Sequence, residues 1–390
     1  MRRLLFLLLP LLALHAGGQS YRKLHSKAIV ADTHNDFPST SIEKSVSFDT
    51  DLQGKTHSDL RRMIEGGLDI QVFSIFCGPE QNAPYTFANR EIDSVYAWVQ
   101  RNPESIALVK TPAELRSALR SRKLIAMMGV EGGHMIAENL ENLDRLYERG
   151  VRYMTLTWNN STGWATSAAD ETMKKDSLQH KGLTDFGRQV VHRMNELGMM
   201  VDVSHVGEQT FWDAIAVSTK PVIASHSCAW ALCPHRRNLK DEQIRAIGKT
   251  GGVIFLNFYS GFIDSSYERQ AAVFQARHKA EIDSMVANGT QKDYAGIIVS
   301  EKYREEWKSF RPPLSLLLDH LDYIVKLIGV DHVGLGSDFD GIEAPPKELN
   351  GVEDYPLITK GLVKRGYNKR DIKKILGGNF IRVFEAVQQR

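Results

Sequence analysis

Short apolar segments alternate along the chain with longer amphipathic stretches. Eight of the short segments are nearly continuous in apolar residues, as expected for parallel strands that are buried on both faces. They span residues 28–31, 68–76, 124–130, 153–157, 199–203, 221–224, 252–257 and 332–336. The stretches 183–197, 241–248 and 313–328 have helical periodicity, and Thr184 or Asp185 can cap the first of them before Gly198 ends it. Eight strands with helical crossovers predict an α/β fold of the (β/α)₈, or TIM, barrel type.

One connection is much longer than the others. Between the seventh and eighth predicted strands, residues 262–311 form a charged, helix-rich insertion. Because it follows the C-terminal end of a strand, it is either a lid over the site or a peripheral decoration. No internal repeat, low-complexity tract or linker divides the chain. Residues 19–390 are therefore predicted to form a single barrel domain.

Residues 1–18 have the layout of a secretory signal peptide. Arg2 and Arg3 precede an apolar run over residues 4–13, and the small residues 16–18 offer a cleavage site. The run is short for a membrane span, so an uncleaved N-terminal anchor is the alternative. We expect an exported protein, periplasmic or extracellular, with no stable membrane insertion after signal cleavage.

The overall charge points to no polyanionic partner. The chain has 49 basic and 47 acidic residues, and loss of the leader leaves 49 − 2 = 47 against 47. A neutral protein has no electrostatic footprint for nucleic acid, so none is expected as a partner. The three cysteines are an odd number and form no disulfide framework. Cys228 and Cys233 either pair in an oxidising compartment or are free buried thiols.

Histidine and carboxylate side chains follow five of the eight predicted strands. They are His34 and Asp36 after the first strand, Glu131 after the third, His205 after the fifth, His226 after the sixth, and Asp338 after the eighth. Barrel enzymes carry their chemistry at the C-terminal ends of the strands. Imidazole and carboxylate together suit zinc and related divalent ions. On extended backbone, His34 and Asp36 point to the same side and can bind one ion.

A set of motifs in fixed order covers residues 28–388. It comprises His34-Asn35-Asp36, Gly129-Val130-Glu131-Gly132-Gly133-His134, Gly150-Val151-Arg152-Tyr153-Met154-Thr155-Leu156-Thr157, Val203-Ser204-His205-Val206, Ser225-His226-Ser227, Arg236-Arg237-Asn238, Asn257-Phe258-Tyr259, Gly336-Ser337-Asp338-Phe339-Asp340-Gly341 and Asn379-Phe380-Ile381-Arg382-Val383-Phe384. In this order and spacing, the chain resembles the membrane dipeptidase (renal dipeptidase) family of zinc peptidases.

The resemblance implies two Zn²⁺ ions per chain. His34 and Asp36 would bind the first ion, His205 and His226 the second, and Glu131 would bridge the two. A carboxylate suits a bridge because it has two oxygens and offsets the charge of two cations. The nucleophile would be a hydroxide between the metals, which zinc makes available near neutral pH.

The resemblance also implies roles outside the metal ligands. Asp338 would be the general acid–base that takes the proton from water and delivers it to the leaving amine, with Asp340 as the competing residue. Arg237 would hold the free carboxylate of a dipeptide, since a guanidinium matches its two oxygens, and Arg236 is the alternative. Many relatives are homodimers, so a homodimer is expected.

The chain departs from the family pattern at Trp158, where many members have a histidine that binds the substrate. Trp158 offers only an indole N–H. Asn159 is a candidate substitute donor, Trp158 and Trp164 are candidates for an apolar wall, and Tyr259 is a candidate substrate contact. A tyrosine found in some relatives corresponds to Phe262 here.

Three functions therefore remain open at this point. The first is a zinc dipeptidase, including one that accepts a C-terminal D-residue, as family members often do. The second is a related barrel metallohydrolase acting on another amide, lactone or ester. The third is a non-catalytic peptide-binding protein on the same scaffold. Against it, all five expected metal ligands and the expected general acid–base Asp338 are present in the sequence.

Overall fold

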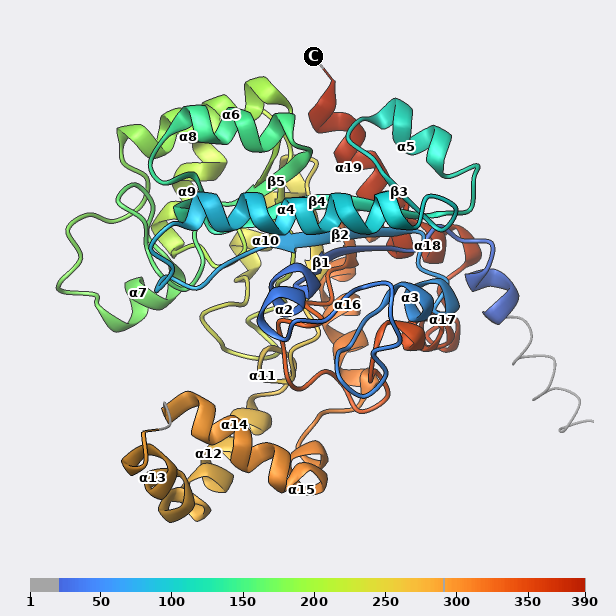
Figure 1. The fold of residues 1–390 in the computed structure, drawn as a ribbon. Coiled ribbons are helices and arrows are strands. Elements are labelled where there is room, and N and C mark those ends of the chain that lie inside the picture. Colours follow the sequence, from blue (N-terminus) through green and yellow to red (C-terminus); the bar gives the residue numbers. More distant parts are fainter. Residues whose placement is uncertain (1–20, 290–291, 390) are drawn as a thin grey trace, which may run out of the picture.

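The computed structural model describes residues 21–289 and 292–389 (Figure 1). The predicted signal peptide lies outside these residues. Eight parallel strands form a nearly closed barrel in the order β1, β2, β4, β5, β6, β7, β8 and β9. Their bounds are β1 Ala31–Asn35, β2 Ile70–Ile75, β4 Leu124–Glu131, β5 Val151–Thr155, β6 Met200–Asp202, β7 Val222–Ala224, β8 Val253–Leu256 and β9 Val333–Leu335. The predicted (β/α)₈ barrel is confirmed.

Two details of the sheet differ from the prediction. The first strand lies at Ala31–Asn35 rather than 28–31, so it includes His34. Its polar residues can be buried because they have internal partners; the Thr33 hydroxyl, for example, donates to the carbonyl of Ser225 at 2.7 Å. A further strand, β3 (Ile106–Leu108), pairs with the start of β4 outside the barrel circuit. Its three residues are too few to give a pattern.

Helices surround the barrel and connect its strands. They are α2 Phe37–Glu43, α3 Leu60–Glu65, α4 Pro84–Arg101, α5 Pro112–Ala118, α6 Leu140–Glu148, α7 Ala168–Met173, α8 Asp185–Leu197, α9 Glu208–Val217, α10 Asp241–Lys249, α16 Leu314–Ile328, α17 Tyr355–Lys364, α18 Lys369–Lys373 and α19 Asn379–Gln388. The three helices predicted from periodicity are α8, α10 and α16. Helix α8 has the predicted ends: the Thr184 side chain accepts from the Gly187 N–H, and Gly198 is left-handed at φ 78°.

Helix α19 closes one end of the barrel. Its Phe380, Val383 and Phe384 form a buried cluster with residues from the interior of the sheet, among them Ile70 and Met127. A larger apolar core lies between the sheet and the surrounding helices. Because α19 fills the end where the strands begin, the opposite end, where they finish, is available for polar side chains.

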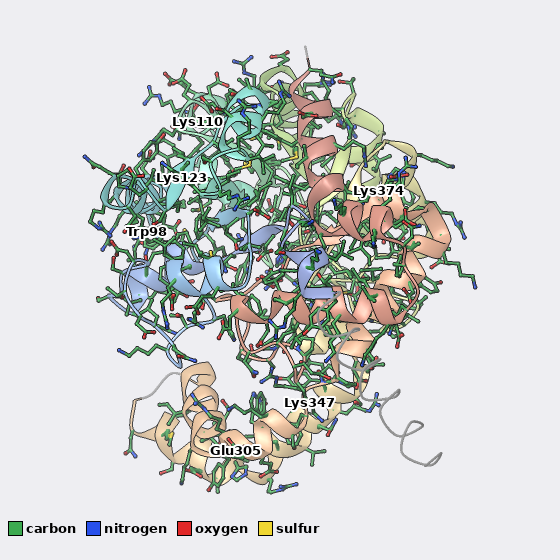
Figure 2. The ribbon with its side chains drawn as sticks, turned by 90° about the vertical axis from the view of Figure 1, so that its right-hand side faces the viewer. Trp98, Lys110, Lys123, Glu305, Lys347 and Lys374 are labelled. Carbon is green, nitrogen blue, oxygen red and sulfur yellow. The ribbon has the colours of Figure 1, made fainter. Side chains whose placement is uncertain are left out.

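The predicted insertion contains α11 Ser260–Ile263, α12 Ser265–Arg277, α13 Lys279–Ala287, α14 Lys292–Lys302 and α15 Arg304–Ser309. Its described helices have a small apolar cluster of their own that includes Phe274 and Ile282. Both views show the helices of the insertion projecting away from the barrel (Figures 1 and 2). In Figure 2, Glu305 of α15 lies well apart from Trp98 and Lys374, which belong to the body of the barrel. Among the described residues of 262–311, only Phe262 lines the cavity at the C-terminal ends of the strands, so the helices α12 to α15 are a decoration rather than a lid.

Cys77, Cys228 and Cys233 are all free and buried. The thiol of Cys228 donates to the carbonyl of Asn257 at 3.2 Å, and that of Cys233 to the carbonyl of Gly261 at 3.4 Å. Cys228 and Cys233 are therefore free buried thiols and do not pair with each other. Among the described residues, no helix has both the length and the apolar character needed to span a bilayer.

Candidate metal centre

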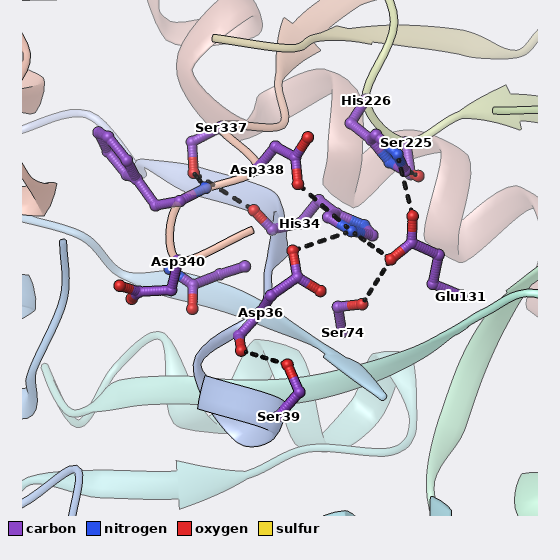
Figure 3. Close-up of polar contacts among 12 residues, drawn as sticks. His34, Asp36, Ser39, Ser74, Glu131, Ser225, His226, Ser337, Asp338 and Asp340 are labelled. Atoms are coloured by element: carbon purple, nitrogen blue, oxygen red, sulfur yellow. Dashed lines mark hydrogen bonds and ion pairs between the residues drawn. The ribbon is translucent and has the colours of Figure 1, made fainter. Parts of the chain in front are cut away.

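The barrel brings all five predicted ligands to one place at the ends of its strands. His34 lies in β1 with Asp36 just beyond it, Glu131 ends β4, and His205 and His226 follow β6 and β7. All five are buried, and none is more than 7% exposed. Figure 3 shows His34 at the middle of the group, with the carboxylates of Asp36, Glu131 and Asp338 around its imidazole.

The two carboxylate oxygens of Glu131 face different partners. Its Oε2 lies 3.4 Å from Nε2 of His34, which is 3.5 Å from Oδ2 of Asp36. Its Oε1 lies 2.8 Å from Nε2 of His205 and 3.4 Å from Nε2 of His226. Glu131 thus stands between a His–Asp pair and a His–His pair, which is the arrangement of a bridging ligand.

The hydrogen bonds of the three histidines fix which ring nitrogen faces the site. The Tyr153 hydroxyl donates to the carbonyl of Thr33 at 3.0 Å, so its oxygen accepts from Nδ1–H of His34 at 2.8 Å. The Ser225 hydroxyl donates to Asp202 at 2.6 Å, so its oxygen accepts from Nδ1–H of His226 at 2.8 Å.

His205 has the same tautomer. Its Nδ1 lies 3.1 Å from the side-chain oxygen of Asn159, an acceptor, when the amide is oriented in this way. Each of the three imidazoles therefore presents the lone pair of Nε2 to the centre. A ligating histidine is oriented by a hydrogen bond at its other nitrogen in this manner.

This donor set fits divalent cations. Nε2 of His34 and Oδ1 of Asp36 are buried and have no hydrogen-bond partner among the described residues. Nε2 of His205 and Nε2 of His226 lie 2.9 Å apart, although both are acceptors in the tautomers above. Ligand atoms gather in two overlapping groups, one of His34, Glu131 and His226 and one of His34, Asp36 and Asp338. Cations among these atoms would relieve the facing lone pairs and the clustered negative charge.

Burial and the clustered charges shift the pKa values of the histidines in opposite directions. Burial and then the nearby Arg237 lower the pKa of His205 to about 3. Burial also lowers the pKa of His34, but Tyr153, Asp36 and Glu131 outweigh it, and the net pKa is well above the usual value. The carboxylates around His34 thus attract a positive charge, which a proton or a metal ion can supply.

Two buried aspartates tie neighbouring strand ends together in the same way. Asp32 accepts from the N–H of Ser337 at 2.8 Å and from its hydroxyl at 2.6 Å. Asp202 accepts from the N–H of Ser225 at 2.8 Å and from its hydroxyl at 2.6 Å. Each serine immediately precedes a site residue, Asp338 or His226. The first of these contacts also joins β1 to β9, where the sheet closes.

Two site residues occupy strained backbone. His205 has φ 65° and Asp338 has φ 64°, in the left-handed region that residues other than glycine seldom adopt. Such strain persists only where the surrounding structure holds it, and it concentrates at functional sites. Here the hydrogen bonds at the strand ends hold the chain, so that His205 turns towards Glu131 and Asp338 towards His34.

The structure separates the two carboxylates near the end of β9. Asp338 has its Oδ1 3.9 Å from Nε2 of His34, and its Oδ2 accepts from the amide of Asn257 at 2.7 Å. Burial and then Asp36 raise the pKa of Asp338 well above its usual range. Asp340 points away from the cluster (Figure 3), and its carboxylate accepts from the N–H of His57 at 2.6 Å and from the Ser58 hydroxyl. Asp340 therefore has a structural role.

Gly341 follows Asp340 for a steric reason. A Cβ at this position would lie 2.2 Å from Oδ2 of Asp36, closer than side chains approach one another. The close approach keeps the Asp36 carboxylate beside the turn that carries Asp338. A side chain at 341 would push Asp36 out of the site.

Arg237, rather than Arg236, faces the centre. Arg237 is 5% exposed, and its Nη2 donates to the carbonyl of His226 at 3.3 Å. Its Nε is buried and has no partner among the described residues, so the guanidinium retains a free donor. Burial lowers the pKa of Arg237 to about 10, and the group is still charged at neutral pH. Arg236, its neighbour in the same loop, is exposed to solvent.

A cavity of about 340 Å³ lies over the cluster. Its lining includes Glu131, His205, Arg237 and Asp338, together with the three remaining predicted substrate contacts, Trp158, Asn159 and Tyr259. Phe262 lines it as well. Trp158 packs against Phe76, with ring centroids 5.0 Å apart. Trp164 is fully buried beside Phe186 and does not line the cavity, so the apolar wall consists of Trp158 and Phe76.

Comparisons with known proteins show the family and the fold of the chain. The family model for membrane dipeptidase (peptidase family M19) matches residues 19–390. The probable dipeptidase PvdM from Pseudomonas aeruginosa has a similar structure, with TM-score 0.77, 24% identity, and coverage of 96% of this chain and 99% of that one. A second similar structure is a dipeptidase described as a metallo peptidase, with TM-score 0.73, 25% identity, and coverage of 92% and 98%.

A third similar structure is a metallo peptidase from Rhodobacter sphaeroides, liganded with a phosphinate mimic of the dipeptide L-Ala-D-Ala. Its TM-score is 0.72 at 24% identity, with coverage of 93% of this chain and 100% of that one. At this identity the likeness shows the fold. The family model spans almost the whole chain, and the chain belongs to the membrane dipeptidase family, peptidase family M19.

Proposed function

We propose that this metallodipeptidase is an exported, binuclear zinc enzyme that hydrolyses dipeptides, including those with a C-terminal D-residue. The division of the Glu131 oxygens between two ligand pairs carries the proposal. His34 and Asp36 would hold one ion and His205 and His226 the other. When bound, the ions would acidify water and polarise the scissile carbonyl.

The chain's own residues account for the remaining steps. Arg237 would bind the substrate's free carboxylate through its unpartnered Nε–H and so place the peptide bond beside Glu131. Asp338 would accept the proton of the attacking water at Oδ1, since its Oδ2 already accepts from Asn257. It would then deliver that proton to the leaving amine.

The active site also favours short substrates. The buried guanidinium of Arg237 is fixed a short distance from the ligand cluster, and both line one cavity of about 340 Å³. A longer peptide would have no free carboxylate at this position. The proposed acceptance of a C-terminal D-residue is supported by the phosphinate mimic of L-Ala-D-Ala bound to the similar structure from Rhodobacter sphaeroides.

The proposal is tested by metal analysis together with a panel of L-L and L-D dipeptides. We expect two zinc ions per chain and release of free amino acids. Metal-replete protein that turns over no dipeptide would contradict it. Asp338→Asn should abolish turnover while both metals stay bound, and an unchanged rate would exclude the role given to Asp338.

Trp158 supports a second candidate, a hydrolase of acyl-amino acids or lactones. Its indole and Phe76 form an apolar wall where many family members have a histidine. Such a wall would suit an acyl chain better than a charged amino terminus. Comparing rates on dipeptides with those on N-acyl-amino acids and lactones separates the two candidates.

A further inference from the structure

A second, larger cavity adjoins the metal site. It has a volume of about 760 Å³ and shares His205 and Arg237 with the cavity over the metal cluster. These two side chains thus form the partition between the two spaces. The other walls come from α7 and the segment after it, from α9, and from the loop that follows β7. We call this space the basic chamber because of the side chains that line it.

The basic chamber contains three cations that have no ion-pair partner among the described residues. They are Lys175, Lys181 and Arg236, and all three are exposed to solvent. A fourth cation, Lys240, is paired, because its Nζ lies 2.8 Å from Oε2 of Glu208. With Arg237 in the partition, the chamber has an excess of positive charge.

The carboxylates of the chamber do not cancel this excess. The carboxylate of Glu208 already forms an ion pair with Lys240. The other carboxylate, Glu171, accepts from the hydroxyl of Thr166 at 2.6 Å and from the N–H of Gln209 at 3.4 Å. Neither carboxylate pairs with Lys175, Lys181 or Arg236. The chamber therefore offers free cationic groups to a ligand.

The cavity over the metal cluster has the opposite composition. Its charged side chains other than histidine and Arg237 are all carboxylates, namely Asp36, Glu43, Glu131, Asp338, Asp340 and Glu343. In the proposed function, bound cations would offset the charge of Asp36 and Glu131. The basic chamber offers no such carboxylate cluster, so its excess of cationic side chains distinguishes it from the metal-site cavity.

We propose that the basic chamber receives the side chain of the substrate's C-terminal residue and selects a carboxylate there. This rests on the proposed function, in which Arg237 holds the C-terminal carboxylate. The side chain of that residue branches from the carbon next to this carboxylate, so it lies beside Arg237, which lines the chamber as well. Aspartate and glutamate would then meet Lys175, Lys181 and Arg236, whose long side chains can reach a carboxylate.

The expected selectivity is moderate because these cations are exposed and screened by solvent. Contacts of this kind contribute about two- to fivefold each, so together they should give about a tenfold preference. The preference should fall as salt is raised, since exposed charges are screened over about 10 Å at 0.1 M ionic strength. The preference should appear as a lower KM with an unchanged kcat. The side chain of the substrate's C-terminal residue lies away from the scissile bond, so it contacts the enzyme equally before and during bond cleavage.

The test compares kcat/KM for Ala-Glu with that for Ala-Gln, and for Ala-Asp with that for Ala-Asn, using L- and D-forms of the second residue. Within each pair, the side chains of the second residue differ in charge but hardly in shape. We expect ratios of about ten for the wild type. The double variant Lys181→Gln/Arg236→Gln should reduce the ratios to about two. The charge-matched control Lys369→Gln/Lys373→Gln alters two exposed lysines of α18 outside both cavities and should leave them unchanged.

Ratios near one for the wild type would overturn the inference, as would ratios that the chamber variant and the control lower equally. Matching melting temperatures of the two variants would show that a lowered ratio does not come from misfolding. Failure of the proposed function is a separate result: no dipeptide, acidic or neutral, would be cleaved, and the inference would fall with it.

Discussion

Replacing Asp202 with asparagine should damage the metal centre through Ser225, without touching a ligand directly. Asp202 is fully buried, and its Oδ2 accepts from the hydroxyls of Ser225 at 2.6 Å and Thr155 at 2.5 Å. In asparagine an amide nitrogen takes the place of Oδ2, and this nitrogen cannot accept a hydrogen bond. The Ser225 hydroxyl is then free to donate to Nδ1 of His226, which favours the tautomer that has its proton on Nε2. That tautomer has no lone pair for a metal.

The size of the effect follows from these contacts. A hydrogen bond to a charged group contributes about 1.5–3 kcal/mol. The variant loses two such bonds, those from the Ser225 and Thr155 hydroxyls, and the hydroxyls recover part of this energy when they rotate to new partners. We therefore expect the free energy of unfolding to fall by about 2–4 kcal/mol. Loss of the partner that orients a ligating histidine should weaken metal binding by about 10- to 100-fold. Chemical unfolding measures the first quantity, and zinc titration against a competing chelator measures the second.

Asp69→Asn is a control away from the site. Among the described residues Asp69 accepts one hydrogen bond, from the N–H of Val30 at 2.8 Å, and it lies before β2, where the strands begin. This variant should lose about 1 kcal/mol of stability and bind zinc normally. If Asp202→Asn is destabilised yet binds both zinc ions with unchanged affinity, Asp202 only supports the fold, and the reasoning from the His226 tautomer is refuted.

Three other variants test separate parts of the site. Arg237→Gln should raise KM for dipeptides by about 10- to 100-fold by removing a charge-assisted contact, and steady-state kinetics should show no such change for substrates with an amidated C-terminus. Tyr153→Phe leaves Nδ1 of His34 without its partner and should weaken zinc binding by about 10- to 100-fold in a chelator titration; unchanged affinity would contradict the role of Tyr153. Asp340→Asn should lower stability by about 1–3 kcal/mol while metal content, measured by elemental analysis, stays at the wild-type level.

Much of the barrel could be predicted from the sequence because buried parallel strands leave a clear pattern. A strand covered on both faces is nearly all apolar, as in β2 and β4, and such segments are conspicuous between amphipathic helices. The same criterion misplaced β1, whose Asp32, Thr33, His34 and Asn35 are polar and buried. Their burial depends on partners such as Ser225 and Ser337, which are distant in sequence.

The metal ligands were predictable for a related reason. Side chains at the ends of barrel strands converge, so histidine and carboxylate after separate strands can be grouped before the structure is known. Their supporting residues gave no such signal. Tyr153 reads as an ordinary strand residue, and its contact with His34 spans 119 positions. Asn257 and Ser225 stood within recognised motifs, but their partners, Asp338 and Asp202, could be assigned only in three dimensions.

The residues around the cavity show the same limit. Trp158 and Trp164 are both aromatic and six positions apart, and together they read as one apolar wall. In the structure Trp164 packs beneath Phe186, and Phe76 from the end of β2 takes its place beside Trp158. Arg236 and Arg237 were likewise equivalent in sequence, and only the direction of the loop separates the buried guanidinium from the exposed one.

The most direct test of the two-metal centre is anomalous diffraction at the zinc edge from crystals of the zinc-loaded protein. The geometry predicts two peaks, one beside His34 and Asp36 and one beside His205 and His226, with the Glu131 carboxylate between them. A single peak, or two peaks of which only one contacts Glu131, would contradict the bridging role on which the proposed function depends.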